Sequence, residues 1–319
     1  MNGVLTCFRN TSFSSVSTID LNMSTSSEPG TRGNLTVEQK RSLQEAWVHL
    51  FRLSGDQVAH DAPEKTGDFL HHLNNKSPDH FSHNLWETFL ADHPDTTILR
   101  FLRARDFDVI KAVEMFVSSI NWREERQVQK TIIAGGEAVG LRTDLTSDDE
   151  AFMAQYRSGK SYVRGTDKDD HPVYVIRVRY HDPHKQTAEA METYVLHNIE
   201  TLRMMAREPK DKVCLIFDLT SFGLRNMDFH VIKFLIDVLE TRYPETLGVV
   251  LVHNAPFVFW GELSLYSYSL TISNILSRRL DRHQALARPS RCIKNPLHQR
   301  HKRPPQVHPQ EQSAKVLRR

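Results

Sequence analysis

Residues 213–261 read VCLIFDLTSFGLRNMDFHVIKFLIDVLETRYPETLGVVLVHNAPFVFWG. This stretch decides the fold, because two almost wholly apolar runs, 213–219 and 249–252, flank a third apolar segment at 228–242. Strands that read as continuous apolar runs are buried on both faces, as in a parallel sheet covered by helices. The middle segment is too densely apolar for a surface helix, so we expect it to be largely buried. The sequence therefore predicts a strand–helix–strand unit with parallel strands.

This unit carries more apolar surface than its length requires, and it contains no recognisable catalytic constellation. Such an excess suits a cavity for an apolar ligand. We expect the cavity walls to come from large apolar side chains of the strands, the helix and the adjoining loops, namely Phe217, Phe222, Phe234, Val238, Leu251 and Phe257. A place in the packed core is the alternative for Leu251 and Phe257. The unit indicates binding rather than catalysis.

The chain upstream of this unit predicts more strands and a helical lobe. SYVRG at 161–165 and PVYVIRVRY at 172–180 read as strands, and Thr187 is expected to begin a helix. Strands that alternate with helices predict a mainly parallel sheet joined by right-handed crossovers. Nearer the N-terminus, Asp95 and Asp108 are the expected N-caps of two helices.

The predicted fold class is α/β, with a small N-terminal helical lobe followed by a mainly parallel sheet that carries helices. An amphipathic helix at 35–53 and a polar loop at 54–82 open the helical lobe. We expect five segments in order: a disordered extension (1–35), the helical lobe (36–130), a connector (131–155), an incomplete ligand-binding lobe (156–261) and a basic tail (262–319).

Charge separates the tail from the rest of the chain. The net charge is +2, yet residues 262–319 hold 12 Lys and Arg against 3 Asp and Glu. The tail therefore carries +9 and the preceding residues −7, so the two parts are not expected to share a core. Five prolines and few apolar residues predict a disordered tail.

Three cysteines are too few and too scattered for a disulfide framework or a zinc site. No stretch approaches the roughly 18–20 apolar residues that a membrane span needs. We therefore expect a reducing, cytoplasmic compartment. Met23 opens a more ordinary cytosolic start, so residues 1–22 are expected to be an extension of the gene prediction.

Several motifs agree in order and spacing with one family. TILRFLRARDFDVIKAVEMF followed by WREER, SYVRGTDKDDHPVYVIRV, CLIFDLTSFGLRNMDF and YPETLGVVLVHNAPFVFWG resemble the CRAL-TRIO family, and within it the fungal phosphatidylinositol-transfer proteins. The resemblance covers roughly residues 40–261. It implies a sheet floor beneath helices that enclose one phospholipid or another isoprenoid-like lipid.

The resemblance also implies two head-group contacts. Arg105 would pair with the phosphate of an inositol lipid, for which a planar guanidinium is suited. Glu245, in YPE, would accept hydrogen bonds from inositol hydroxyls. A solvated helix face remains the alternative for Arg105, and a helix-terminating role remains the alternative for Glu245.

The chain departs from the family in two places. Val213 and Leu215 stand where the phosphatidylcholine-reading members carry hydroxyl residues, which argues against a choline head group there. After Gly261 the family's apolar gate helix, a further strand, and the Thr and Lys that hold inositol phosphate are not recognisable. A misread exon or a retained intron is the expected cause.

Other functions have weaker support. Residues 154–161, AQYRSGKS, come within one residue of a phosphate-binding loop, but Ala154 replaces the first glycine and the expected strand-before, helix-after context is absent. His181 and His184, with His171 nearby, have a plausible metal spacing, but a surface turn is the preferred interpretation. Ser221 has no nucleophile-elbow context.

The sequence thus predicts a lipid-binding or lipid-transfer protein without catalytic activity, metal or cofactor. Phosphatidylinositol is the expected ligand, and contact with the membrane surface is expected to be transient, with no nucleic acid as partner. The alternative is an interaction or membrane-tethering module that does not transfer lipid, whose basic tail would bind anionic head groups. A remote alternative is an NTPase with a phosphate-binding loop.

Overall fold

Within the part of the chain that the structure describes, four strands form a single sheet in the order β1–β2–β3–β4. β1 (Ser161–Thr166) pairs antiparallel with β2 (Pro172–Arg177), whereas β2, β3 (Val213–Asp218) and β4 (Leu247–His253) run parallel. The predicted mainly parallel sheet is therefore confirmed. The computed structural model describes residues 28–56, 76–90, 92–206, 208 and 210–255. Phe257, the extension at 1–22 and the tail at 262–319 lie outside these residues.

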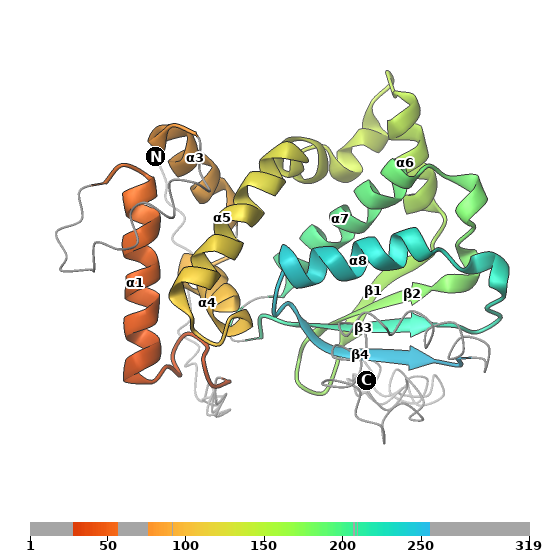
Figure 1. The fold of residues 1–319 in the computed structure, drawn as a ribbon. Coiled ribbons are helices and arrows are strands. Elements are labelled where there is room, and N and C mark those ends of the chain that lie inside the picture. Colours follow the sequence, from red (N-terminus) through yellow and green to blue (C-terminus); the bar gives the residue numbers. More distant parts are fainter. Residues whose placement is uncertain (1–27, 57–75, 91, 207, 209, 256–319) are drawn as a thin grey trace, which may run out of the picture.

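Two long helices cover one face of this sheet, α7 (Ala188–Met205) and α8 (Phe229–Thr241) (Figure 1). Thr187 caps α7 as expected, since its side chain accepts a hydrogen bond from the backbone N–H of Ala190. The β3 run is buried on both faces, because Val213 and Leu215 pack on the helix side, in the same cluster as Leu202 of α7.

The prediction that α8 is largely buried is wrong. Of its residues only Val238 is buried, and Phe229 is 38% exposed. The helix is apolar for another reason, because Val231, Ile232, Leu235, Ile236 and Leu239 line a cavity above the sheet.

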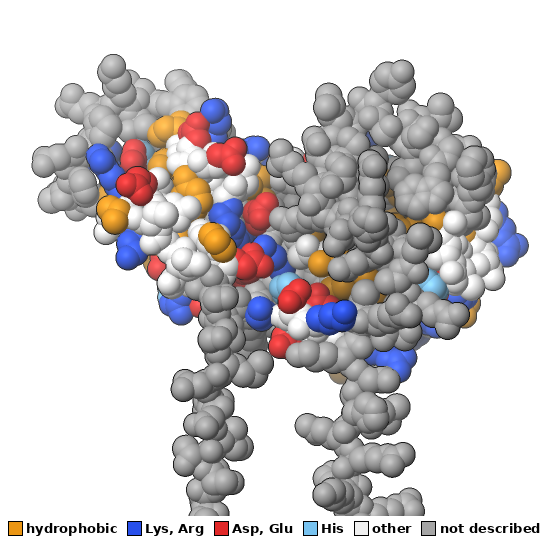
Figure 2. Space-filling view, turned by 90° about the horizontal axis from the view of Figure 1, so that it is seen from below, with side chains coloured by type: hydrophobic (Ala, Val, Ile, Leu, Met, Phe, Trp, Pro, Cys, Tyr) orange, Lys and Arg blue, Asp and Glu red, His pale blue; other side chains and the backbone are white. Residues whose placement is uncertain are grey.

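In its described residues, the helical lobe contains the helices α1 (Val37–Leu53), α3 (Pro78–Phe89), α4 (Pro94–Ala104) and α5 (Val109–Glu125). Their inward faces form one apolar core that includes Leu50, Leu85, Leu99 and Phe116. Viewed from below, this lobe carries acidic and basic side chains intermingled over its surface (Figure 2).

Two local predictions for the helical lobe need correction. The last five residues of the loop expected at 54–82 belong to α3. Ser77 caps this helix, and Pro78 is its first residue. The cap of α4 is His93 rather than Asp95, which lies in the first turn. Asp108 is confirmed as the cap of α5, since it accepts from the backbone N–H of Lys111.

The predicted connector is mostly helical. A π-helix (Val128–Ile133), a 3-10 helix (Gly136–Leu141) and α6 (Ser147–Arg157) link the two lobes, with a capping box between Thr146 and Asp149 at the start of α6. Three short 3-10 turns complete the described elements: Val178–Tyr180, Pro183–Lys185 and Leu224–Asn226.

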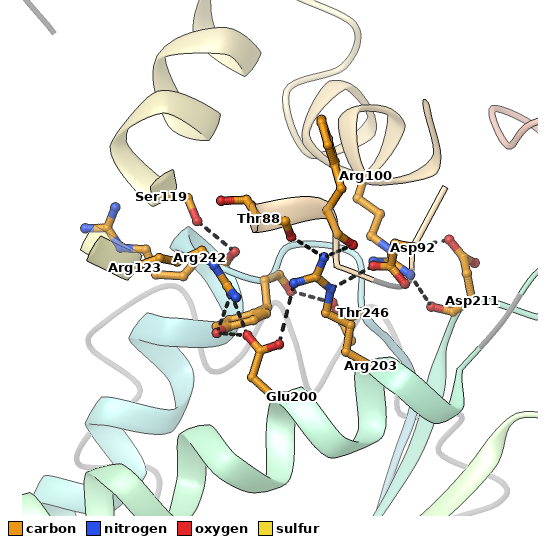
Figure 3. A network of polar contacts seen from close by, with 12 residues as sticks. Thr88, Asp92, Arg100, Ser119, Arg123, Glu200, Arg203, Asp211, Arg242 and Thr246 are labelled. Atoms are coloured by element: carbon orange, nitrogen blue, oxygen red, sulfur yellow. Dashed lines mark hydrogen bonds and ion pairs between the residues drawn. The ribbon is translucent and has the colours of Figure 1, made fainter. Parts of the chain in front are cut away.

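A buried polar network joins the lobes (Figure 3). Arg203 of α7 donates to the Asp92 carboxylate at 2.7 Å and to the carbonyls of Thr88 and Phe89. Arg100 Nη1 of α4 donates to the same carboxylate oxygen, Asp92 Oδ2, at 2.9 Å. Because these groups are almost wholly buried and mutually paired, they fix the helical lobe against α7.

Residues 28–35, expected to be part of a disordered extension, instead make defined contacts. The backbone N–H of Gly30 bonds to the carbonyl of Asn34, and Arg32 pairs with Glu208 at 2.9 Å. No helix of the described ranges is long and apolar enough to cross a bilayer.

Candidate lipid-binding site

A cavity of about 240 Å³ lies between the sheet and helices α7 and α8. Its walls are mainly apolar and come from β2, β3, β4 and both helices. Lining residues occur near the amino ends of the strands, at Val213 and Leu247, and near their carboxyl ends, at Phe217 and Val252. The cavity therefore follows the length of the strands.

The volume limits what the described walls can enclose. Pockets for drug-sized ligands usually measure about 300–1,000 Å³. A lipid with two acyl chains is larger than a typical drug, so the walls must move apart to admit one. Helix α8 contributes much of the wall, because its inner side faces the cavity.

The predicted wall residues fall into three groups. Phe217 and Phe222 line the cavity. Phe234 and Val238 instead pack in a cluster with Leu196 and Ile199 of α7. Leu251 belongs to a cluster on the opposite face of the sheet, since strand side chains alternate and its neighbours Val250 and Val252 take the cavity side.

The amino-terminal end of the cavity lies near Glu245, which precedes β4 by two residues and adopts a left-handed conformation with φ 57°. The arginine close to it is Arg103. Burial lowers the pKa of Arg103, whereas the charges of Asp211 and Glu245 act in the opposite direction. Arg103 Nη1 donates to the carbonyl of Gly30 at 3.0 Å, and Nη2 lies 3.6 Å from Asp211 Oδ2.

Arg105 lies elsewhere. It is the exposed C-cap residue of α4. Arg103 is partly buried, whereas Arg105 is exposed, so the two side chains have different surroundings. Within the described part of the chain, Arg103 Nε and Nη2 are buried and donate no hydrogen bond, although Nη2 is paired with Asp211.

The carboxyl-terminal end of the cavity holds a cluster that the sequence did not reveal. Lys160 is only 4% exposed, and its Nζ lies 2.6 Å from Gln155 Oε1 and 3.3 Å from His181 Nδ1. His181 Nε2 lies 3.0 Å from Asp228 Oδ2. Burial lowers the pKa of Lys160 to about 8, although the charge of Asp228 opposes the shift.

Hydroxyl groups adjoin this cluster. Tyr174 donates to Ser161 Oγ at 2.5 Å, and Ser161 in turn hydrogen-bonds Tyr194. Burial raises the pKa of Tyr174 well above its ordinary value, so this hydroxyl keeps its proton. All three residues line the cavity and give this end a polar rim.

His181 was expected on a surface turn, and this prediction is wrong, because the ring is buried between Lys160 and Asp228. Burial and the neighbouring Lys160 lower the pKa of His181, so the neutral ring donates from Nε2 and accepts at Nδ1. His184 is exposed and lies outside this cluster. His171 pairs instead with Asp167 in the β1–β2 turn.

The structure also excludes the phosphate-binding loop at 154–161. Such a loop requires a strand before it and a helix after it. Here the segment begins inside α6 and ends at the first residue of β1, and the Lys160 ammonium lies next to Gln155 and His181. A lysine in a glycine-containing turn was the only available signal for Lys160, and the sequence gave no indication of its partners.

Comparisons with known proteins agree with this arrangement. Phosphatidylinositol transfer protein CSR1 of Eremothecium gossypii is 38% identical over 178 residues, which cover 56% of this chain and 40% of that protein. CRAL-TRIO domain-containing protein C3H8.02 of Schizosaccharomyces pombe is 37% identical over 180 residues, which cover 56% of this chain and 39% of that protein. The matched part thus spans about two fifths of the length of these relatives.

A structural match, the crystal structure of Sfh5, covers 72% of this chain and 75% of that chain at 14% identity, with a TM-score of 0.43. Residues 156–275 match the CRAL/TRIO domain, so the match extends beyond Gly261, and residues 65–118 match the CRAL/TRIO N-terminal domain. The chain belongs to the CRAL-TRIO family of lipid-binding and lipid-transfer proteins.

Proposed function

We propose that this chain binds one lipid in the cavity and carries it between membranes, with phosphatidylinositol as the ligand. The observation that supports this most directly is the apolar cavity that follows the strands beneath α7 and α8. The relative CSR1 is named a phosphatidylinositol transfer protein, which supports the choice of lipid. The protein would act without catalysis, metal or cofactor.

The driving force is the transfer of acyl chains from bilayer to protein without exposure to water. Each methylene that left an apolar environment for water would cost about 0.8 kcal/mol. Extraction is therefore feasible only if the cavity replaces nearly all the apolar contacts of the bilayer. The apolar inner side of α8, with Val231, Leu235 and Leu239 among its wall residues, provides such contacts.

The head group is proposed to lie near Glu245, with an arginine on its phosphate. Family resemblance nominates Arg105 for this arginine, whereas the electrostatic coupling to Glu245 supports Arg103. A guanidinium is suited to bidentate contact with phosphate, and a carboxylate can accept hydrogen bonds from the inositol hydroxyls. The two arginines form a natural matched pair of test sites.

The proposed setting is the cytoplasm, with transient contact to a membrane surface during lipid exchange. No nucleic acid partner is proposed. A tethering protein that binds membranes without transferring lipid is the competing function, and a transfer assay separates the two.

The test measures transfer of labelled phosphatidylinositol between donor and acceptor vesicles. We expect Arg103→Gln and Glu245→Gln to reduce the transfer rate about tenfold or more, since a charged hydrogen bond is worth about 1.5–3 kcal/mol. Arg105→Gln is the matched control and should retain transfer. Loss of transfer in Arg105→Gln alone would reverse the assignment, and vesicle binding without transfer by the unmodified chain would favour the tethering function.

A further inference from the structure

The carboxyl-terminal end of the cavity contains a buried cation, and the nearest carboxylate, that of Asp228, reaches it only through His181. Lys160 is 4% exposed, and the two polar atoms closest to its Nζ belong to a neutral amide, on Gln155, and a neutral imidazole, on His181. An ammonium group carries three N–H donors. The third contact of Nζ is the Met191 sulfur at 3.8 Å, which is a weak acceptor.

The neighbouring carboxylates are already engaged. Asp228 accepts from His181 Nε2 at 3.0 Å and, as the cap of α8, from the backbone N–H of Val231 at 3.1 Å. Asp182 lies at the surface and pairs with Lys185 at 3.5 Å. Within the described residues no carboxylate lies at ion-pair distance from Lys160. A buried charge without a partner is costly, so this ammonium is a strong site for an anion.

A second cation lies at the same end of the cavity. Arg177 of β2 lines the cavity and donates to the carbonyl of Gly159. Its guanidinium stacks with the Tyr162 and Tyr180 rings at 5.0 and 4.8 Å. Its Nε donates no hydrogen bond within the described residues. Two cationic side chains, Lys160 and Arg177, and one carboxylate, that of Asp228, therefore line this end of the cavity.

We propose that Lys160 binds the anionic oxygen group, a carboxylate or a phosphate, of a ligand whose single apolar chain lies along the strands. The hydroxyls of Ser161 and Tyr194 adjoin this position. The inference rests on the proposed lipid cavity but uses its opposite end. Glu245 and Arg103 lie near the amino ends of the strands, whereas Lys160 lies at the carboxyl ends, roughly 17 Å away along a six-residue strand.

The cavity favours a single-chain ligand. Its volume of about 240 Å³ is below the usual range of about 300–1,000 Å³ for drug-sized ligands, so one chain requires less movement of the walls than two. An acyl chain that ended at Lys160 without a polar group would leave the ammonium against hydrocarbon. An anionic group at this position instead removes the electrostatic penalty of the buried charge.

The direct test titrates cis-parinaric acid, a fluorescent carboxylate with one apolar chain, into the full chain at pH 7 and compares it with its methyl ester. We expect the acid to bind about 10- to 100-fold more tightly, the range that a charged hydrogen bond supplies. Lys160→Met should remove this preference, and Lys160→Arg should retain most of it. Equal affinity of acid and ester for the unmodified chain would overturn the proposal without recourse to any variant.

Competition distinguishes the two sources of the anion. Oleate and 1-oleoyl lysophosphatidate are each used to displace the probe, and the tighter competitor identifies carboxylate or phosphate. Displacement by neither, at concentrations that saturate an ordinary lipid carrier, would contradict the proposal. Phosphatidylinositol transfer is measured separately. If the chain transfers phosphatidylinositol but binds acid and ester equally, only the inference about Lys160 fails. If it prefers the acid but does not transfer phosphatidylinositol, only the choice of phosphatidylinositol as ligand fails.

The preference should also depend on pH. It should weaken between pH 7 and 9.5 as the Lys160 ammonium loses its proton, and Lys160→Met should show no such change. The unmodified chain and Lys160→Met share the other charged or titratable groups around this position, so the titration of these groups affects both. These groups are His181, Asp182, Asp228, Tyr174, Tyr194 and Arg177.

Discussion

Arg123 of α5 donates to Glu200 of α7 across the boundary between the lobes, with 2.5 Å between Nη1 and Oε1. Both side chains are almost wholly buried. Tyr243 completes the group, since its hydroxyl also donates to Glu200 Oε1. This buried ion pair joins the strand-bearing lobe to the helical lobe, as do the contacts of Arg203 with Asp92.

Removing the carboxylate should destabilise the whole chain. Glu200→Gln leaves Arg123 and Arg203 without their shared anion, and breaking one partner of a buried pair costs about 3–5 kcal/mol. Urea unfolding measures this change in the free energy of unfolding. The matched control is Arg142→Gln, which removes an exposed pair with Asp144 and should cost less than about 1 kcal/mol. Equal losses in the two variants would show that burial adds nothing.

The same pair predicts the acid limit of stability. Burial alone would raise the pKa of Glu200, but the charges of Arg123 and Arg203 lower it below the ordinary 4.5. A lowered pKa stabilises the fold above the unfolded value and ceases to do so as pH falls through the folded value. The unmodified chain should therefore lose stability below about pH 4.5 more steeply than Glu200→Gln. Parallel pH profiles would contradict this.

Lys160 predicts a further rise of stability with pH, in the alkaline range. Its folded pKa of about 8 lies below the ordinary 10.5, so the unfolded chain binds more protons between these values. Stability should therefore rise across this window, by about 1.4 kcal/mol for each unit of difference. The difference in unfolding free energy between the unmodified chain and Lys160→Met isolates this effect, because tyrosines with raised pKa contribute equally to both. A difference that does not change with pH would refute the prediction.

Replacing Glu245 by glycine should preserve or raise stability and reduce lipid transfer. Its left-handed backbone, with φ 57°, costs about 1–2 kcal/mol in a residue other than glycine. Glu245→Gly should therefore unfold at equal or higher urea concentration, while phosphatidylinositol transfer falls about tenfold. Glu245→Gln keeps the strained backbone and removes only the charge. Unchanged transfer in both variants would show that the carboxylate has no part in lipid recognition.

Filling the cavity should displace the lipid. Leu235 lines the cavity from α8, whereas Lys233 on the same helix is exposed. Leu235→Trp should reduce lipid occupancy about tenfold, because overpacking costs about 1–3 kcal/mol. Lys233→Trp adds the same ring to the solvent side and should leave occupancy unchanged. The amount of lipid extracted per mole of protein distinguishes the two variants.

The sequence predicted the parallel unit well, because continuous apolar runs have few other interpretations. β3, α8 and β4 lie within two residues of their expected positions, and the Asp108 and Thr187 caps are confirmed. Burial of α8 was mispredicted, because an apolar helix can face either a packed core or a cavity, and the two produce the same sequence pattern.

The polar ends of the cavity were harder to predict. Arg103 and Arg105 are only two residues apart in the chain, so the sequence alone does not say which of them lies closer to Glu245. The Lys160 cluster depends on contacts over 21 residues to His181 and a further 47 to Asp228. Such contacts are set by how the loops return over the sheet, and hydrophobic periodicity contains no information about them.

Native mass spectrometry of the purified, full 319-residue chain tests the central claim most directly. We expect a complex with one lipid per chain, which releases a single amphiphilic species on denaturation. We expect Leu235→Trp to lose this bound lipid. A folded, monodisperse chain without any bound lipid, even after incubation with phosphatidylinositol vesicles, would contradict the central claim.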